Sequence, residues 1–145
     1  MTIESIATHN LAPLAQLMLA LWPDSSLDEA LGSCESILYS ETETCYLFKD
    51  TEAYVAFIHV TLRYDYVEGA DTSPVGYIEG IYVQEAYRHL GLGRQLMAVA
   101  EAWAKQKGCK QLASDTGLSQ TASIEFHKKN GFSEVNRIVC FIKDL

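Results

Sequence analysis

The sequence has little positive charge and no long apolar run. Its 11 Lys and Arg residues oppose 19 Asp and Glu residues, which gives a net charge of −8. Because a protein that binds nucleic acid needs a basic face, we expect no nucleic-acid partner. No apolar stretch is long enough to cross a membrane, and the first ten residues lack the basic-then-apolar order of a signal peptide. These absences favour a cytoplasmic protein with no membrane partner.

Recognisable metal and nucleophile motifs are also missing. The four cysteines form no C-x-x-C pair, so they suggest neither a zinc site nor a disulfide framework, and we expect buried free thiols. The histidines His9, His59 and His89 lack the spacing of metal ligands, and no G-x-S-x-G nucleophile elbow occurs. We therefore expect no metal.

The charges that are present divide unevenly along the chain. Residues 1–87 contain fourteen acidic and two basic residues, whereas residues 88–145 contain five acidic and nine basic ones. Such an asymmetry suits one cationic and one anionic ligand. Solvated faces that merely differ in charge are the simpler explanation on this evidence alone.

At 145 residues the chain is long enough for one domain with a sizeable core, and we expect a single domain over residues 1–145. Apolar periodicity, turn residues and β-branched content predict helices and strands in the order β-α-α-β-β-β-α-β-α-β. This order indicates an α/β or α+β fold, a mixed sheet covered by helices. The expected strands are 2–6, 45–49, 53–67, 75–83, 109–115 and 134–143, and the expected helices are 10–22, 24–40, 94–108 and 119–131.

The most informative motif is RHLGLG, residues 88–93, at a strand-to-helix junction. Glycines there permit a simple chain reversal, or they let backbone N–H groups hold an anion at a helix start. A P-loop is excluded because Arg94 and Gln95 follow the last glycine. The dinucleotide fingerprint needs a third glycine where the chain has Leu96, so only the acidic Asp115 downstream supports it.

The remaining pattern, Arg-x-x-Gly-x-Gly, resembles the pyrophosphate-binding motif of the GNAT superfamily of N-acetyltransferases. The stretches YIEGIYV before it and FHKKNGF near the end also resemble that superfamily. More narrowly, RYDYVEGADTSPVGYIEGIYV and LASDT are similar to the short-chain aminoglycoside 6'-N-acetyltransferases. The resemblance covers nearly the whole chain, including Trp22-Pro23. It implies a mixed, mostly antiparallel sheet flanked by helices, acetyl-CoA as co-substrate, and a homodimer.

The coenzyme site expected at this motif has a physical basis. Backbone N–H groups of residues 89–94 would hold a pyrophosphate at the first helical turn, where the helix dipole adds about 0.3–1 kcal/mol. Arginines supply charge, and small glycines allow close approach. The resemblance adds pantetheine contacts in residues 81–83, where a backbone N–H would also serve as oxyanion donor. The expected coenzyme residues are Ile81, Tyr82, Val83, Arg88, His89, Gly91, Leu92, Gly93, Arg94 and His127.

The expected substrate site is carried mainly by the resemblance. Glu79 lies in the middle of an apolar strand, a costly place for an unused charge, and Asp115 ends the next strand. The resemblance assigns both to amine binding and proton handling, and it assigns Trp22 and Tyr66 to aromatic contacts. The alternatives are a surface charge for Glu79, a turn cap for Asp115 and a core position for Trp22. The loop acids Asp65, Glu68 and Asp71 would add acidic walls or are simply solvated.

Two positions depart from the family pattern. Many superfamily members have a tyrosine four residues before the Gly-Phe pair, as a candidate acid for the coenzyme thiolate, and this chain has His127 there. Imidazole can donate a proton or a hydrogen bond to sulfur, although a helix histidine is usually structural. Close relatives tend to be acidic where this chain has Asn136, so its drug range is expected to differ.

The expected activity is acetyl transfer from acetyl-CoA to the 6'-amine of aminoglycosides, by direct attack in a ternary complex and conferring antibiotic resistance. A polyamine, peptide or small-metabolite acetyltransferase with the same coenzyme site is the first alternative. A non-catalytic acyl-CoA-binding sensor is the second. An acidic pocket shaped for a polycation would favour the aminoglycoside enzyme, and an absent or blocked pocket would favour the sensor.

Overall fold

A computed structural model describes all 145 residues and places a five-stranded sheet at the centre of the molecule. The strands follow one another in chain order, and every neighbouring pair is antiparallel except β4 and β5, which are parallel. The predicted mixed, mostly antiparallel sheet is therefore confirmed. The strands are β1 (Thr2–Ser5), β2 (Glu43–Asp50), β3 (Ala53–Arg63), β4 (Val75–Val83) and β5 (Leu112–Ser114).

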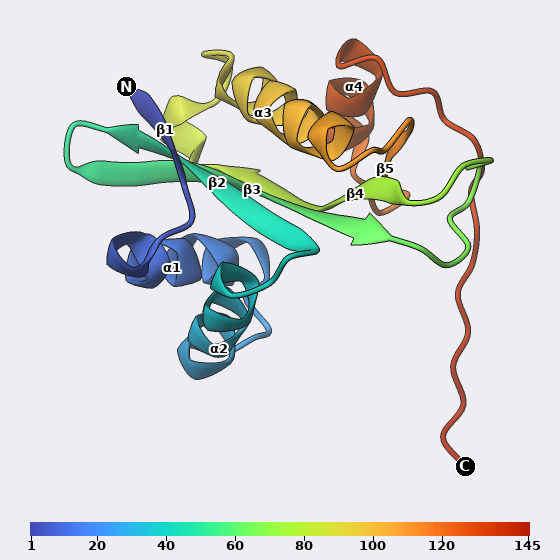
Figure 1. The fold of residues 1–145 in the computed structure, drawn as a ribbon, viewed down its shortest axis with the longest axis horizontal. Helices are drawn as coiled ribbons and strands as arrows, with labels where there is room; N and C mark the ends of the chain where they lie inside the picture. The colour runs from blue at the N-terminus through green and yellow to red at the C-terminus, as the bar shows by residue number, and fades with distance from the viewer.

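Four helices cover the two faces of the sheet (Figure 1). Helices α1 (Leu11–Leu21) and α2 (Leu27–Leu38) pack on one face around a cluster that contains Leu14, Leu47 and Phe57. Helices α3 (Leu92–Gln106) and α4 (Thr121–Lys129) lie on the other face, where α3 buries Leu96 and Met97 against the sheet. Short 3-10 turns, η1 (Thr8–Asn10) and η2 (Glu85–Tyr87), precede α1 and α3. None of the helices combines the length and the apolar character needed to cross a membrane.

Local capping explains where the helices begin and end. The Ser26 side chain accepts a hydrogen bond from the Glu29 backbone N–H at 3.1 Å, which starts α2 at Leu27, inside the expected helix 24–40. At the other end of the fold, α3 stops before Gly108, whose φ of +88° is left-handed and suits glycine. Asn130 and Gly131 close α4 in the same manner.

Strand β4 changes partners along its length, and this produces an opening in the sheet. It pairs with β3 throughout, with a bulge at Glu79, because His59 faces Gly80 and the next residue, Val60, faces Ile78. It pairs with β5 only from Gly76 to Ile78. Beyond Ile78, the β5 side of β4 has no strand partner, so residues 79–83 border a gap between the two strands.

The prediction of a last strand over residues 134–143 is wrong for the single chain. Residues 134–143 form no strand and run as an extended segment away from the body of the molecule (Figure 1). Its apolar side chains are exposed, Phe141 and Ile142 almost completely. The expectation of buried thiols holds for Cys34, Cys45 and Cys109, but Cys140 lies in this segment and is exposed. The segment is rich in the β-branched and aromatic residues typical of a strand but has no strand partner within its own chain.

Candidate active site

The RHLGLG motif forms a row of unpaired backbone donors at the start of α3. The six backbone N–H groups from His89 to Arg94 donate no hydrogen bond within the chain, and the first helical bond runs from the Gln95 N–H to the Gly91 carbonyl. His89 and Gly91 both have left-handed backbones, with φ of +63° and +83°. The resulting concave run of amides at a helix N-terminus is suited to a polyphosphate.

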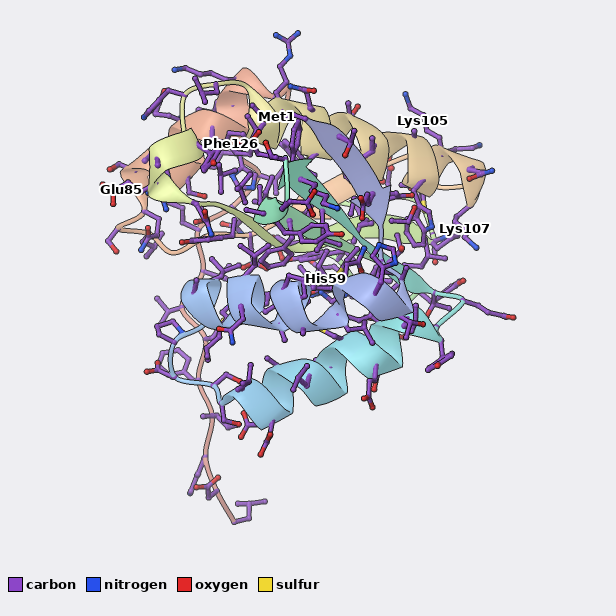
Figure 2. The ribbon with its side chains drawn as sticks, turned by 90° about the vertical axis from the view of Figure 1, so that its left-hand side faces the viewer. Met1, His59, Glu85, Lys105, Lys107 and Phe126 are labelled. Atoms are coloured by element: carbon purple, nitrogen blue, oxygen red, sulfur yellow. The ribbon has the colours of Figure 1, made fainter.

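The two glycines of this motif serve different purposes. A Cβ atom at Gly91 would meet nothing within 4 Å, so no packing contact within the chain requires glycine there. The positive φ favours it, because glycine adopts a left-handed backbone without strain. A Cβ at Gly93 would instead lie 2.9 Å from the ring of Phe126 in α4, which Figure 2 labels. Close packing of α4 over the start of α3 therefore accounts for Gly93, in addition to the expected phosphate contact.

The expected coenzyme residues contribute in unequal ways. The Arg88 Nε–H donates to the Val83 carbonyl at 2.8 Å, which ties the loop to the end of β4, and the exposed guanidinium lies 5.8 Å from the centre of the Tyr82 ring. Arg94 is exposed on the first turn of α3. The Leu92 side chain is only 3% exposed and belongs to the core, so this residue offers only its backbone N–H. Residues 81–83 border the gap beyond β5.

His127 is held by hydrogen bonds at both ring nitrogens. Its Nδ1 lies 2.7 Å from the Ser123 carbonyl, which only accepts, so this nitrogen carries the proton in the neutral ring. Its Nε2 lies 2.8 Å from the Ser114 hydroxyl at the end of β5 and therefore accepts from it. The neutral ring has no free N–H for a thiolate, and a role of His127 toward the coenzyme stays a prediction.

Glu79 projects from the bulge of β4 toward the face covered by α1 and α2. Its carboxylate accepts from the Thr61 hydroxyl at 2.8 Å and from two Arg63 groups, Nε–H at 3.0 Å and Nη2–H at 2.9 Å. The Glu79 side chain is 26% exposed. Arg63 and partial exposure thus account for a charge that the sequence alone places in an apolar strand.

Asp115 lies beside the same face, connected to it by a tyrosine. The Tyr77 hydroxyl donates to Asp115 Oδ2, and the Arg63 guanidinium lies 3.4 Å above the Tyr77 ring. Burial and this hydrogen bond raise the pKa of Tyr77 well above its usual value, which keeps the phenol protonated as a donor. The two predicted carboxylates are therefore joined through the stacked pair of Arg63 and Tyr77.

A cavity of about 410 Å³ opens between this face of the sheet and helices α1 and α2. Trp22 and Glu79 both line it, so the structure brings these two predicted residues together. Trp22 is 40% exposed and packs edge-on against Phe57 at 6.1 Å, so it is neither fully in the core nor free. His59, labelled in Figure 2, also lines the cavity and pairs with Glu43 at 2.8 Å.

Tyr66 does not line this cavity. It lies in the loop between β3 and β4, is 82% exposed, and its hydroxyl donates to Glu68 at 2.8 Å. Asn136, at the start of the extended segment, donates to the other oxygen of Glu68 at 2.8 Å. These two hydrogen bonds, that of Asn136 above all, lower the pKa of Glu68. Asn136 therefore stabilises a loop carboxylate that an acidic residue at the same position would repel.

The comparisons with known proteins agree with this geometry. The pattern of the acetyltransferase (GNAT) family matches residues 9–132. The chain belongs to the GNAT acetyltransferase family. It is 41% identical over 137 residues to an aminoglycoside N(6')-acetyltransferase type 1 of Serratia marcescens, covering 94% of each chain.

Solved structures of the same family superpose closely on this acetyltransferase. AAC(6')-Iy in complex with the bisubstrate analog CoA-S-monomethyl-acetylneamine matches with a TM-score of 0.96 and 32% identity, over 99% of this chain and 98% of that one. AAC(6')-Iy in complex with CoA also matches with a TM-score of 0.96 and 32% identity, over 99% and 95%. The predicted GNAT fold and the resemblance to aminoglycoside 6'-N-acetyltransferases are confirmed.

Sequence reasoning on this GNAT acetyltransferase missed the polar residues of β3. Arg63 and Thr61 lie 16 and 18 positions from Glu79 and meet it only through the antiparallel register of β3 and β4. The alternation of His59, Thr61 and Arg63 in an otherwise apolar strand was the one available signal, because period-two residues share a face.

Proposed function

We propose that this protein transfers the acetyl group of acetyl-CoA to the 6'-amino group of aminoglycosides, by direct attack in a ternary complex. The observation that carries the proposal is that the open side of β4, which begins after Ile78, has Glu79 at one end and Val83 at the other, where the Arg88–Val83 hydrogen bond attaches the loop with the free amides of residues 89–94. The free amides of residues 89–94 suit an anionic coenzyme. The acidic face, which carries Glu79 and Asp115, suits a cationic amine. Relatives with the corresponding name support the choice of substrate.

The residues around the start of α3 fit the coenzyme. The amides from His89 to Arg94 would bind its pyrophosphate, and Arg88 and Arg94 would supply charge. Residues 81–83 would bind the pantetheine arm along the open side of β4. The coenzyme, when bound, supplies an acetyl group activated as a thioester.

The acidic face fits the acceptor amine, which is mostly an ammonium at neutral pH and must lose a proton before it can attack. Asp115 and Glu79 would attract the ammonium, orient it and accept its proton directly or through water. A backbone N–H of Ile81, Tyr82 or Val83 would donate to the carbonyl oxygen as negative charge develops on it. Trp22 would pack against a sugar ring from the wall of the cavity, and Tyr66 would contact the substrate from the adjacent loop.

The experiment that tests this function follows the release of free thiol from acetyl-CoA with a panel of acceptors. We expect turnover with aminoglycosides that carry a 6'-amine, at a kcat/KM at least about a hundredfold above that with spermidine or lysine-containing peptides. Faster turnover of the polyamine or peptide would assign the protein to another acceptor. Binding of acetyl-CoA without turnover of any acceptor would indicate a sensor.

We also propose that the protein acts as a cytoplasmic homodimer held by its C-terminal segments, residues 133–145. The exposed apolar side chains of this segment, Val135, Ile138, Val139, Phe141 and Ile142, have no cover within the single chain, and β5 has an unpaired outer edge. A hollow of about 650 Å³ lined by Leu112, Ala113 and Phe132 lies beside that edge. Segment 133–145 of a second copy would cover both, which supports pairing between chains.

Sedimentation and thiol labelling test the dimer. We expect a mass of twice the 16.1 kDa chain, and slow labelling of Cys140, which the single chain exposes. Deleting residues 134–145 should give a monomer. A monomeric full-length protein with a rapidly labelled Cys140 would contradict this proposal.

A further inference from the structure

Arg63 contacts Glu79 and Tyr77 on the side of the sheet that carries the candidate carboxylates Glu79 and Asp115. Neither a sequence motif nor its place at the end of a strand explains an arginine here. It is the last residue of β3, and its guanidinium donates two hydrogen bonds to one carboxylate, that of Glu79. The same guanidinium lies over the Tyr77 ring, with its central carbon 3.4 Å from the ring centre. The planar guanidinium of arginine can bind a carboxylate with two donors and lie over an aromatic ring at the same time. Lysine has no such planar group and is a poor substitute.

These contacts connect the two carboxylates of the candidate active site. On one side, Arg63 and Thr61 hold both oxygens of Glu79, so its orientation at the bulge of β4 is determined by β3. On the other side, the Tyr77 ring under the guanidinium directs its hydroxyl to Asp115. The relative positions of Glu79 and Asp115 thus depend on one side chain.

We propose that Arg63 is the positioning residue of the acceptor site, and that it fixes Glu79 directly and Asp115 through Tyr77. This inference rests on the proposed function, because it concerns how the acceptor amine is oriented. Arg63 offsets the charge of Glu79, and both Glu79 oxygens accept hydrogen bonds within the chain. Asp115 Oδ2 accepts from Tyr77, so Asp115 Oδ1 is the one oxygen of these two carboxylates that has no partner within the chain. The ammonium is therefore oriented against Asp115 Oδ1 and the outer lone pairs of Glu79.

The opposite role is the main alternative. A guanidinium on Glu79 resembles a substrate cation already in place, and it could simply compete with the acceptor amine. The two roles predict different kinetics. Loss of a competitor lowers KM and leaves kcat unchanged, whereas loss of a positioning residue lowers kcat because small displacements of reacting groups cost up to about a hundredfold in rate.

The test is a double-mutant cycle between Arg63→Met and Glu79→Gln, with Arg63→Lys as the conservative variant and neamine as the acceptor. We expect Arg63→Met to lower kcat by about 10- to 100-fold, and Arg63→Lys to recover less than about a third of the loss. In the Glu79→Gln background, Arg63→Met should cost less than in the wild-type background, because the part of its effect that passes through Glu79 is already lost and only the part that passes through Tyr77 and Asp115 remains. Tyr77→Phe should reproduce part of the Arg63→Met effect.

Lys49→Met is the matched control. Lys49 also lies on a strand, pairs with a glutamate (Glu4, 3.8 Å) and stands over a tyrosine ring (Tyr54, 5.3 Å), but Glu4 does not line the cavity, whereas Glu79, the partner of Arg63, does. It should leave kcat within about twofold of the wild type. Should Arg63→Met fail to fold, Arg63→Gln takes its place in the cycle.

Additive effects of Arg63→Met and Glu79→Gln, full recovery by Arg63→Lys, or a lower KM at unchanged kcat would each overturn the proposal. A wild-type protein that does not acetylate neamine would contradict the proposed function instead. In that case the cycle is measured with the acceptor that the protein does turn over, or on neamine binding by calorimetry, where the same non-additivity is expected.

Discussion

The Trp22 indole lies directly on Gly80. A Cβ atom at Gly80 would come within 2.5 Å of the Trp22 ring, so the glycine next to Glu79 is the surface on which the indole rests. This contact holds an aromatic wall of the cavity beside the candidate carboxylate. It also explains a glycine in the middle of a strand, where it otherwise weakens the sheet.

Gly80→Ala should therefore displace Trp22 and weaken aminoglycoside binding. We expect KM for neamine to rise by about three- to tenfold with little change in kcat, because the wall contacts substrate and transition state alike. Trp22→Leu should have a similar effect, and the double variant should add little to either. Gly32→Ala, at a helix position where a Cβ meets nothing within 4 Å, serves as the control. An unchanged KM in a folded Gly80→Ala protein would remove Trp22 from the substrate site.

Gly91 offers the sharpest test of the coenzyme site. Gly91 and Gly108 flank the same helix, have φ of +83° and +88°, and would both place a Cβ in open space. Alanine at either position should cost about 1–2 kcal/mol of stability because of the left-handed backbone. Only Gly91→Ala should also weaken acetyl-CoA binding in calorimetry, by at least about tenfold. Equal acetyl-CoA affinities of the two variants would place the coenzyme elsewhere.

The two carboxylates should differ in their kinetic roles. Replacing Glu79 by Gln or Asp115 by Asn keeps the shape and removes the charge, and loss of proton transfer lowers kcat by about 10²–10⁴-fold. The mid-strand position alone favours Glu79 for this effect. The contacts of Arg63 with Glu79 favour Asp115, whose Oδ1 has no partner in the chain. We therefore expect the larger kcat loss in Asp115→Asn. If both variants keep the wild-type kcat at saturating substrate across pH, the two residues only bind the substrate.

Stability at low pH should depend on a contact far from the active site. The Tyr54 hydroxyl donates to Glu4 at 2.6 Å, and this bond, with that of His9, lowers the pKa of Glu4 below its ordinary 4.5. A carboxyl with a lowered pKa in the folded state stabilises the protein above pH 4.5, and the contribution is lost as the pH falls through the lowered value. Tyr54→Phe should thus lose less Tm than the wild type between about pH 5 and 3. Tyr39→Phe, at an exposed tyrosine, should follow the wild type.

Local signals in the sequence were sufficient for most of the fold. Apolar periodicity located α1 and α3 to within two residues at each end. Residues 134–143 have a strand composition as clear as that of β2, yet they form no strand. The residue pattern predicts that a segment can be a strand, but it does not predict which neighbouring strand the segment pairs with.

The candidate site divides in the same way. The coenzyme residues expected at positions 88–94 occupy one short motif, so the spacing of RHLGLG alone predicts that part of the site, whereas Ile81, Tyr82, Val83 and His127 depend on the resemblance. The acceptor site is assembled across three strands, and the partners of Glu79 and Asp115 follow from strand register. Arg63 and Tyr77 lie inside the stretch RYDYVEGADTSPVGYIEGIYV that carries the resemblance, but their contacts with Glu79 and Asp115 could not be recognised from sequence for this reason.

Mapping the acetyl group on the product tests the central claim most directly. The purified protein is incubated with acetyl-CoA and neamine, and with an analogue that has a hydroxyl in place of the 6'-amine, and the products are analysed by mass spectrometry and NMR. We predict one added acetyl group on the 6'-nitrogen of neamine and none on the 6'-hydroxyl analogue, which should still bind and inhibit. An acetyl group on any other nitrogen, or turnover of the analogue, would contradict the assignment.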